Sequence, residues 1–339
     1  MSKRINSIDI LRMAAAFLVV LAHDTNAFVY PYVNSICHSS VLIFFAVSGY
    51  FYCVPKEKKK GRIKKIFILT VITNIAFLLF YAVVSLKDTG IVNYLAKTFT
   101  IDNMFKFIVF NDSPFSEHLW FLSALLYCMI IDYFLSDFLM KRKKLCIALI
   151  VALLLCDLIF GKYSLLFFRT EFDIVYLRNF VFVGIPFFYI GKLFKSIDVS
   201  KIKIKNISLF FLIVLLCATT MVEKYTLMYF DLYARREQYL SLTLLTIVIL
   251  LLVLKNPLDN PGRLSGYIAY SGRKYSLAIY VVHPVLVFAS NFAAKHLGTV
   301  LATAYSFVSG IVIFLAAWLV AIIYYRLKDK IYKPYKTKH

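Results

Sequence analysis

The chain has 339 residues, of which 61% are hydrophobic and 17% aromatic, and its mean hydropathy is +0.76. This is far more apolar surface than a soluble core could bury, so the composition excludes a soluble globular protein and predicts an integral membrane protein. The net charge of +21 does not indicate nucleic acid as a partner, because the basic residues stand in short runs between apolar segments.

Ten apolar segments are long enough to cross the hydrocarbon core of a bilayer as helices. They lie near residues 7–28, 35–54, 66–86, 118–138, 144–160, 174–194, 206–222, 239–255, 270–292 and 299–325. A further apolar stretch at 95–110 carries Lys97, Asp102 and Lys106 at helical spacing, which predicts an amphipathic helix at the membrane interface. The sequence thus predicts an all-α polytopic membrane protein with about ten transmembrane helices in one bundle, a single domain over residues 1–339.

Most of the 39 lysine and arginine residues fall in loops on the side of the N-terminus. The positive-inside rule therefore predicts that both termini are cytoplasmic and that the protein resides in the cell membrane. We expect the first segment to remain as a helix rather than to be removed as a signal peptide, because Arg12 and His23 interrupt it. The six cysteines stand singly, without disulfide or metal-ligand spacing, so no metal is expected.

The first apolar segment contains two ionisable side chains on one helical stripe, within RMAAAFLVVLAHD at residues 12–24. Arg12 and His23 would lie about 16 Å apart along a helix axis and only about 20° apart around it. Such groups are costly in hydrocarbon and usually mark a functional path. The spacing suits a long anionic ligand, such as a coenzyme A thioester, whose phosphates bind Arg12 and whose reactive end reaches His23. Alternatively, Arg12 snorkels and pairs with Asp9 while His23 bonds a neighbouring helix.

Several motifs follow in a recognisable order. SIDILRMAAAFLVVLAH places an arginine, ten intervening residues and a histidine in the first helix. The others are VLIFFAVSGYF (41–51), GRIKKI (61–66), EHLWFLSALL (117–126), RNFVFVGIPFFYIGKLF (178–194) and KYSLAIYVVHP (274–284). In these motifs the chain resembles the acyltransferase-3 family of integral-membrane acyltransferases, which acylate cell-surface glycans and antibiotics. It looks especially similar to the membrane domain of vancomycin-resistance serine racemases, a relative proposed to import serine.

The resemblance implies a donor site and a catalytic residue. Arg12, Arg62 and Lys65 would bind the phosphates of an acyl-CoA donor, and His23 would take a proton from the acceptor or carry the acyl group itself. The family often has two arginines where this chain has Arg62 and Lys65, so bidentate geometry is lost at the second position. The positive-inside run explains Arg62 equally well.

Polar residues at two predicted helix starts on the outer face are candidate acceptor contacts. Glu117 and His118 open the fourth span, and Arg178 and Asn179 open the sixth. Interfacial helix starts and snorkelling are the alternative explanations. His283 precedes Pro284, where it can bond a freed backbone carbonyl, so a structural role explains it at least as well.

These features predict a membrane acyltransferase that moves an acyl group, such as acetyl, from cytoplasmic acyl-CoA to an O- or N-acceptor such as a cell-surface glycan or polysaccharide. Two alternatives belong to other classes. A transporter would move a small polar solute such as L-serine without a thioester. A non-catalytic partner of a glycan-assembly system would tolerate loss of His23.

Overall fold

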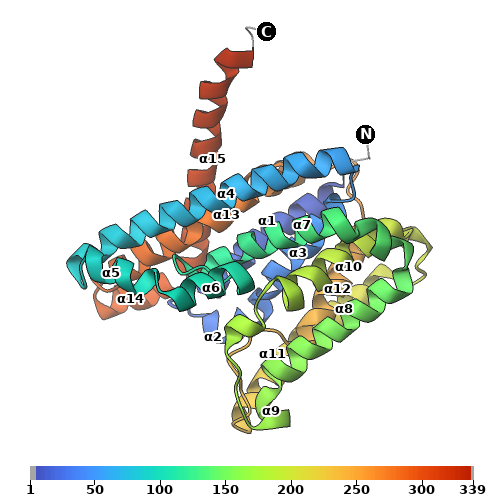
Figure 1. Cartoon of the computed structure of the whole chain (residues 1–339), viewed down its shortest axis with the longest axis horizontal. Coiled ribbons are helices and arrows are strands. Elements are labelled where there is room, and N and C mark those ends of the chain that lie inside the picture. Colours follow the sequence, from blue (N-terminus) through green and yellow to red (C-terminus); the bar gives the residue numbers. More distant parts are fainter. Residues whose placement is uncertain (1–4, 337–339) are drawn as a thin grey trace.

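The computed structural model describes residues 5–336, with side chains to residue 330, and over this range every regular element is helical (Figure 1). The α-helices are α1 (Asn6–His23), α2 (Tyr30–Cys37), α3 (Ser39–Phe51), α4 (Lys56–Val84), α5 (Ile91–Thr98), α6 (Ile101–Phe110), α7 (Trp120–Lys141), α8 (Lys143–Asp157), α9 (Ser164–Phe168), α10 (Ile185–Ser196), α11 (Asn206–Tyr229), α12 (Leu240–Lys255), α13 (Arg263–Ala294), α14 (Thr299–Ser306) and α15 (Ser309–Lys336). Short turns of other helix types are η1 (Ser85–Lys87), η2 (Glu117–Leu119), η3 (Leu158–Lys162), η4 (Ile174–Tyr176), η5 (Phe180–Gly184) and η6 (Val199–Lys201). The all-α prediction is confirmed.

Eight helical segments in the described part of the chain are long and apolar enough to cross a membrane. They are Asn6–His23, Tyr30–Phe51, Lys56–Lys87, Glu117–Lys141, Lys143–Lys162, Asn206–Tyr229, Arg263–Ala294 and Ser309–Lys330. The other two predicted spans correspond to the shorter helix α12 and to α10, which η5 precedes. A polytopic membrane protein is therefore confirmed, whereas the count of ten and the cytoplasmic position of the termini stay predictions. Residues 1–4 and 337–339 lie outside the described residues.

Several predicted boundaries were wrong for local reasons. The first helix ends at His23 rather than near residue 28, because Asp24 leaves helical geometry and accepts a hydrogen bond from Ser309 Oγ at 2.6 Å. The third begins ten residues earlier than predicted, since the basic run from Lys56 is itself helical. The stretch at 95–110 forms two helices, because Thr100 caps α6 by accepting from the Asn103 amide.

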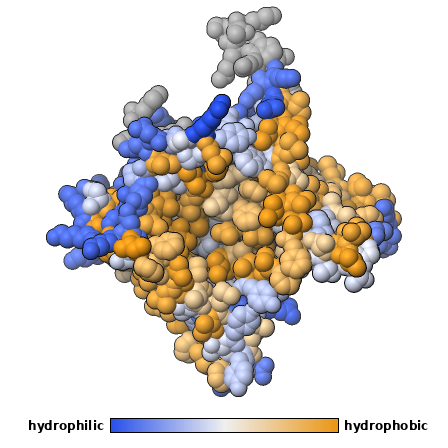
Figure 2. All heavy atoms as spheres, turned by 180° about the vertical axis from the view of Figure 1, so that it is seen from behind, coloured by the Kyte–Doolittle hydropathy of each residue, from blue (hydrophilic) through white to orange (hydrophobic). Residues whose placement is uncertain are grey.

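The helices divide into an inner and an outer group. α1 packs along α13 and α3, and α3 packs along α10, so their apolar side chains form the core. By contrast, α4, α11 and α15 expose most of their apolar residues. Figure 2 shows a face that is mostly apolar, with hydrophilic side chains at its margins. This is the surface expected of a protein whose outer helices contact lipid tails.

A buried ion cluster joins three helices. Asp132 of α7 is fully buried and pairs with Lys59 of α4, where Nζ lies 2.7 Å from Oδ2, and with Lys192 of α10. Lys192 also donates to Ser136 Oγ at 2.6 Å. Because a lone charge is costly in an apolar bundle, these contacts fix how α4, α7 and α10 meet.

Two glycines allow α3 and α10 to approach closely. A Cβ atom on Gly49 would overlap the carbonyl group of Phe188, and one on Gly191 would overlap that of Ala46. Small residues at such crossings are the usual means of close helix packing in membranes. Gly49, in the SGYF segment of the second predicted span, therefore has a packing role.

We predict that Gly49→Ala lowers the thermal unfolding temperature of the detergent-solubilised protein, because overpacking of this kind costs about 1–3 kcal/mol. Gly61→Ala is the control, since a Cβ atom there meets nothing within 4 Å and α4 gains helix propensity. Equal unfolding temperatures for wild type and Gly49→Ala would show that α3 and α10 are not in close contact.

Candidate functional site

A cavity of about 420 Å³ lies where α1 ends, and we call it the histidine cavity. It brings together His23 from α1, Glu117 from η2 and Arg178 from the loop before η5, three residues that the sequence analysis singled out separately. Trp120 and Tyr233 add aromatic faces to its wall. The catalytic candidate and two of the acceptor candidates therefore share one space.

The His23 side chain is exposed to this cavity and held in one orientation by its own helix. Its Nδ1 lies 2.8 Å from the carbonyl oxygen of Val19. Because a carbonyl group can only accept, Nδ1 must carry the hydrogen in the neutral ring. Nε2 then has a free lone pair, which is the form of imidazole that can take a proton.

Two further histidines lie behind His23. The His283 ring packs edge-on against His23 with the centroids 4.9 Å apart, and the His118 ring lies 5.7 Å from His283. Both are buried, and within the described part of the chain their Nε2 atoms have no hydrogen-bond partner. His283 Nδ1 contacts the Tyr280 carbonyl oxygen at 2.7 Å, and His118 Nδ1 contacts Ser116 Oγ at 2.9 Å. His118 is thus placed behind the cavity rather than on its wall.

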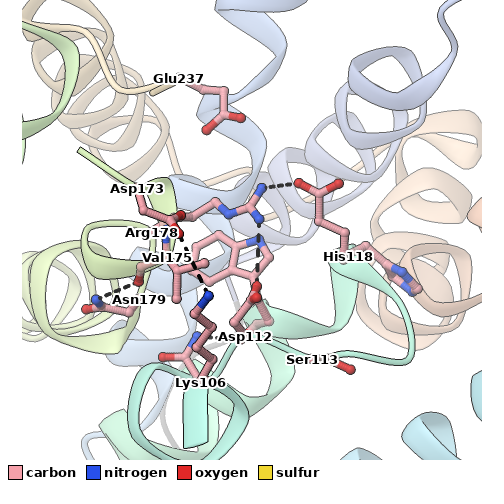
Figure 3. A network of polar contacts seen from close by, with 12 residues as sticks. Lys106, Asp112, Ser113, His118, Asp173, Val175, Arg178, Asn179 and Glu237 are labelled. Carbon is pink, nitrogen blue, oxygen red and sulfur yellow. Dashed lines mark hydrogen bonds and ion pairs between the residues drawn. The ribbon is translucent and has the colours of Figure 1, made fainter. Parts of the chain in front are cut away.

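Arg178 is the centre of an ionic network beside the cavity (Figure 3). Its guanidinium group donates to Glu117 Oε1 at 2.5 Å, and Nη2 lies 3.9 Å from Asp112 Oδ1. The same group lies 5.8 Å from the ring centre of Trp120. Burial raises the pKa of Asp112, although the charge of Arg178 opposes that shift. The network holds Glu117 and Arg178 as a pair.

Two asparagines shape the loop that carries Arg178. Asn179 accepts from the amides of Val181 and Phe182, and its amide nitrogen donates to the carbonyl groups of Val175 and Tyr176. With its amide occupied in this way, Asn179 is suited to positioning Arg178. Asn111, in a left-handed conformation and fully buried, accepts from Phe180 N at 2.8 Å.

The loop between α11 and α12 covers another side of the cavity. Arg236 makes a two-pronged ion pair with the fully buried Asp157 at the end of α8, with N–O distances of 2.9 and 3.0 Å. Lys162 donates to the Ala234 carbonyl oxygen at 2.8 Å. These contacts fix the loop over the cavity, where Glu237 joins the lining.

Glu237 stays ionised in this setting. Burial raises the pKa of Glu237, but electrostatic interactions with His38, Arg178 and Arg236 and a backbone hydrogen bond lower it by more, so the pKa falls below its ordinary value. The cavity therefore offers a carboxylate near Arg178, in addition to Glu117, and His38 also lies on its wall.

The donor candidates Arg12, Arg62 and Lys65 lie around Phe51, toward the other end of α1 from His23. We call this region the basic end. The Arg12 guanidinium lies 4.7 Å from the Phe51 ring centre, and Nη1 of Arg62 donates to the Phe51 carbonyl oxygen at 2.6 Å. Arg12 also contacts Asp9 at 3.4 Å. Lys65 is exposed on α4, three residues after Arg62, and Lys195 lies nearby over Tyr50 with Nζ 4.8 Å from its ring centre.

The stripe of α1 between Arg12 and His23 is closed. Ala16 and Val19 lie on it, and their exposed fractions are 0% and 1%. The two candidate sites are therefore separated by packed side chains, and a ligand that spans them needs α1 to move away from its neighbours.

Three groups at this site are not among the predicted site residues. They are His283, for which the sequence indicates a structural role at least as well as a functional one, His38 on the cavity wall, and the Asp157–Arg236 pair. The signal for that pair was present, because an aspartate inside an apolar span normally has a partner. Nothing in the local sequence indicates that His283 touches His23, since the two residues come from opposite ends of the chain.

A family model described as an acyltransferase domain matches residues 5–324, nearly the whole chain. The chain belongs to the acyltransferase-3 family. The predicted family is confirmed, and with it an integral-membrane enzyme that transfers acyl groups.

No curated protein and no solved structure matches this acyltransferase. The more specific resemblance to the membrane domain of vancomycin-resistance serine racemases thus stays a prediction. Among residues 5–336, no group of three or more His, Cys, Asp or Glu side chains is placed to hold a metal ion.

We predict that Asp157→Ala destabilises the acyltransferase by about 3–5 kcal/mol, because the buried Arg236 loses its two-pronged partner and keeps only the longer contact of Nη1 with Glu237 Oε2 at 3.3 Å. The double variant Asp157→Leu/Arg236→Met should recover most of that loss. Thermal unfolding in detergent measures both, with Asp198→Asn as an exposed control that should behave as wild type. A double variant no more stable than Asp157→Ala would mean that the lost partner of Arg236 is not the cause of the destabilisation.

Proposed function

We propose that this acyltransferase moves an acyl group from acyl-CoA to a hydroxyl or amine acceptor bound in the histidine cavity. The observation that carries the proposal is the orientation of His23, whose Nδ1 contact with Val19 leaves Nε2 free as a base. We assign His23 the role of the base; the same Nε2 lone pair would serve a covalent carrier, so the Val19 contact supports both of the roles predicted from the sequence.

The chemistry follows from this assignment. His23 Nε2 takes the proton of the acceptor as its oxygen or nitrogen attacks the thioester carbonyl carbon. The new bond to carbon forms, the carbon–sulfur bond breaks, and the thiolate of CoA takes the proton from the imidazolium. His283 supports the ring of His23 edge-on, which makes it a positioning residue.

The donor binds at the basic end in this proposal. Arg12 and Arg62 approach the same residue, Phe51, from two helices, so their guanidinium groups can contact neighbouring phosphates. Lys65 adds a third positive charge on α4. The pantetheine arm would follow the stripe of Ala16 and Val19 once α1 moves from its neighbours.

The acceptor binds opposite the donor, in contact with Glu117 and Arg178. Paired charges beside the Trp120 and Tyr233 rings suit the hydroxyl groups and apolar faces of a glycan. His118 and Asn179 serve this site from behind, His118 by packing against His283 and Asn179 by holding the Arg178 loop.

The test is transfer by purified protein in nanodiscs supplied with radiolabelled acetyl-CoA and glycan acceptors, with CoA release and labelled product measured. His23→Gln should lower kcat at least about 100-fold and leave the KM for acetyl-CoA unchanged, because only the base is lost. His296→Gln is a matched control: His296 Nδ1 makes the same contact with a carbonyl four residues earlier, at 2.8 Å, in an exposed position.

Two results would contradict the proposal. His23→Gln could retain activity close to that of His296→Gln, in which case His23 is not the base. Alternatively, wild type could release no CoA from acetyl-CoA or longer acyl-CoAs, which would refute the donor assignment. Serine uptake into proteoliposomes would then test the transport alternative.

A further inference from the structure

The seam between α4 and α7 is hollowed by two cavities that share Phe67 and Leu126 in their walls. One, of about 430 Å³, is lined on α4 by Lys60, Ile63 and Lys64. The other, of about 330 Å³, continues along α4 from Thr70 to Leu78 and is closed on one side by residues of α6. Because they share wall residues, the two cavities form one groove, which we call the α4–α7 groove.

The α4–α7 groove is long enough to hold the extended acyl chain of a membrane lipid. From Lys60 to Leu78 the helix rises about 27 Å, close to the thickness of the hydrocarbon core. Its wall is apolar, and Ile130 and Phe134 of α7 line it with exposed fractions of 36% and 71%. A groove of this kind opens toward lipid rather than toward water.

Charge is confined to one end of the groove. Lys60 and Lys64 are one helical turn apart, so both amines lie on the face of α4 that lines the cavity. Lys56, one turn earlier, lies over Tyr133 with Nζ 4.9 Å from the ring centre. The nearby acid Asp132 is already paired with Lys59 and Lys192, so it does not neutralise Lys60 or Lys64.

We propose that the α4–α7 groove binds an anionic glycerophospholipid of the leaflet at the basic end. Its phosphate pairs with Lys60 and Lys64, and one acyl chain lies along Ile63, Phe67 and Leu126. A free phosphate would leave the apolar wall unfilled, and a zwitterionic lipid would bring a positive group to the lysines. The proposal stands apart from acyl transfer, since His23, Arg12 and Arg62 all lie outside this groove's lining.

The test measures lipid binding to the protein by native mass spectrometry. The two lipids compared are phosphatidylglycerol and phosphatidylcholine with identical acyl chains. Wild type should bind phosphatidylglycerol preferentially. Lys60→Gln/Lys64→Gln should bind it about 30-fold more weakly, because each lysine near an anionic headgroup contributes roughly fivefold. Lys58→Gln/Lys203→Gln removes two exposed lysines outside the groove and should bind as wild type does.

A second variant tests the chain rather than the headgroup. Ile130→Trp narrows the groove and should weaken phosphatidylglycerol binding while both lysines remain. Three results would overturn the proposal: equal binding of the two lipids by wild type, equal phosphatidylglycerol binding by the two double-lysine variants, or displacement of the lipid by millimolar inorganic phosphate. The last would identify a simple anion site at the lysines.

Discussion

The arrangement of the helices in this enzyme depends on the free-energy cost of leaving a charge unpaired inside an apolar bundle. Asp132 holds α4, α7 and α10 together through Lys59 and Lys192, and Asp157 fixes the loop between α11 and α12 through Arg236. Neither acid touches the candidate chemistry. By fixing helices and loops, however, these pairs decide which side chains reach the histidine cavity and which surround Phe51.

The helix α1 connects the two candidate sites. It ends at His23 in the cavity, and Arg12 in its second turn contacts Phe51, with closely packed small and β-branched residues between them. The candidate phosphate site at Arg12 and the candidate base His23 are therefore about three helical turns apart along α1. The closed stripe also prevents water from joining the two ends, so donor binding and opening of α1 are coupled in this account.

Much of the fold followed from the sequence, because apolar runs of bilayer length have few alternatives to a helix. The grouping of His23, Glu117 and Arg178 was also within reach, since the count of spans put them at one end of the bundle. Boundaries failed where a single polar contact decides them, as at Asp24 and Thr100. The contact of His283 with His23 could not be predicted, because it depends on how α13 packs on α1.

The most direct test of the account is an electron cryomicroscopy structure of the protein in a nanodisc with a non-transferable acyl-CoA analogue. We expect nucleotide density beside Arg12 and Arg62, density for the pantetheine arm along Ala16 and Val19, and the thioester end in the histidine cavity beside His23. Nucleotide density away from Phe51, or an acyl end that does not enter the histidine cavity, would contradict it.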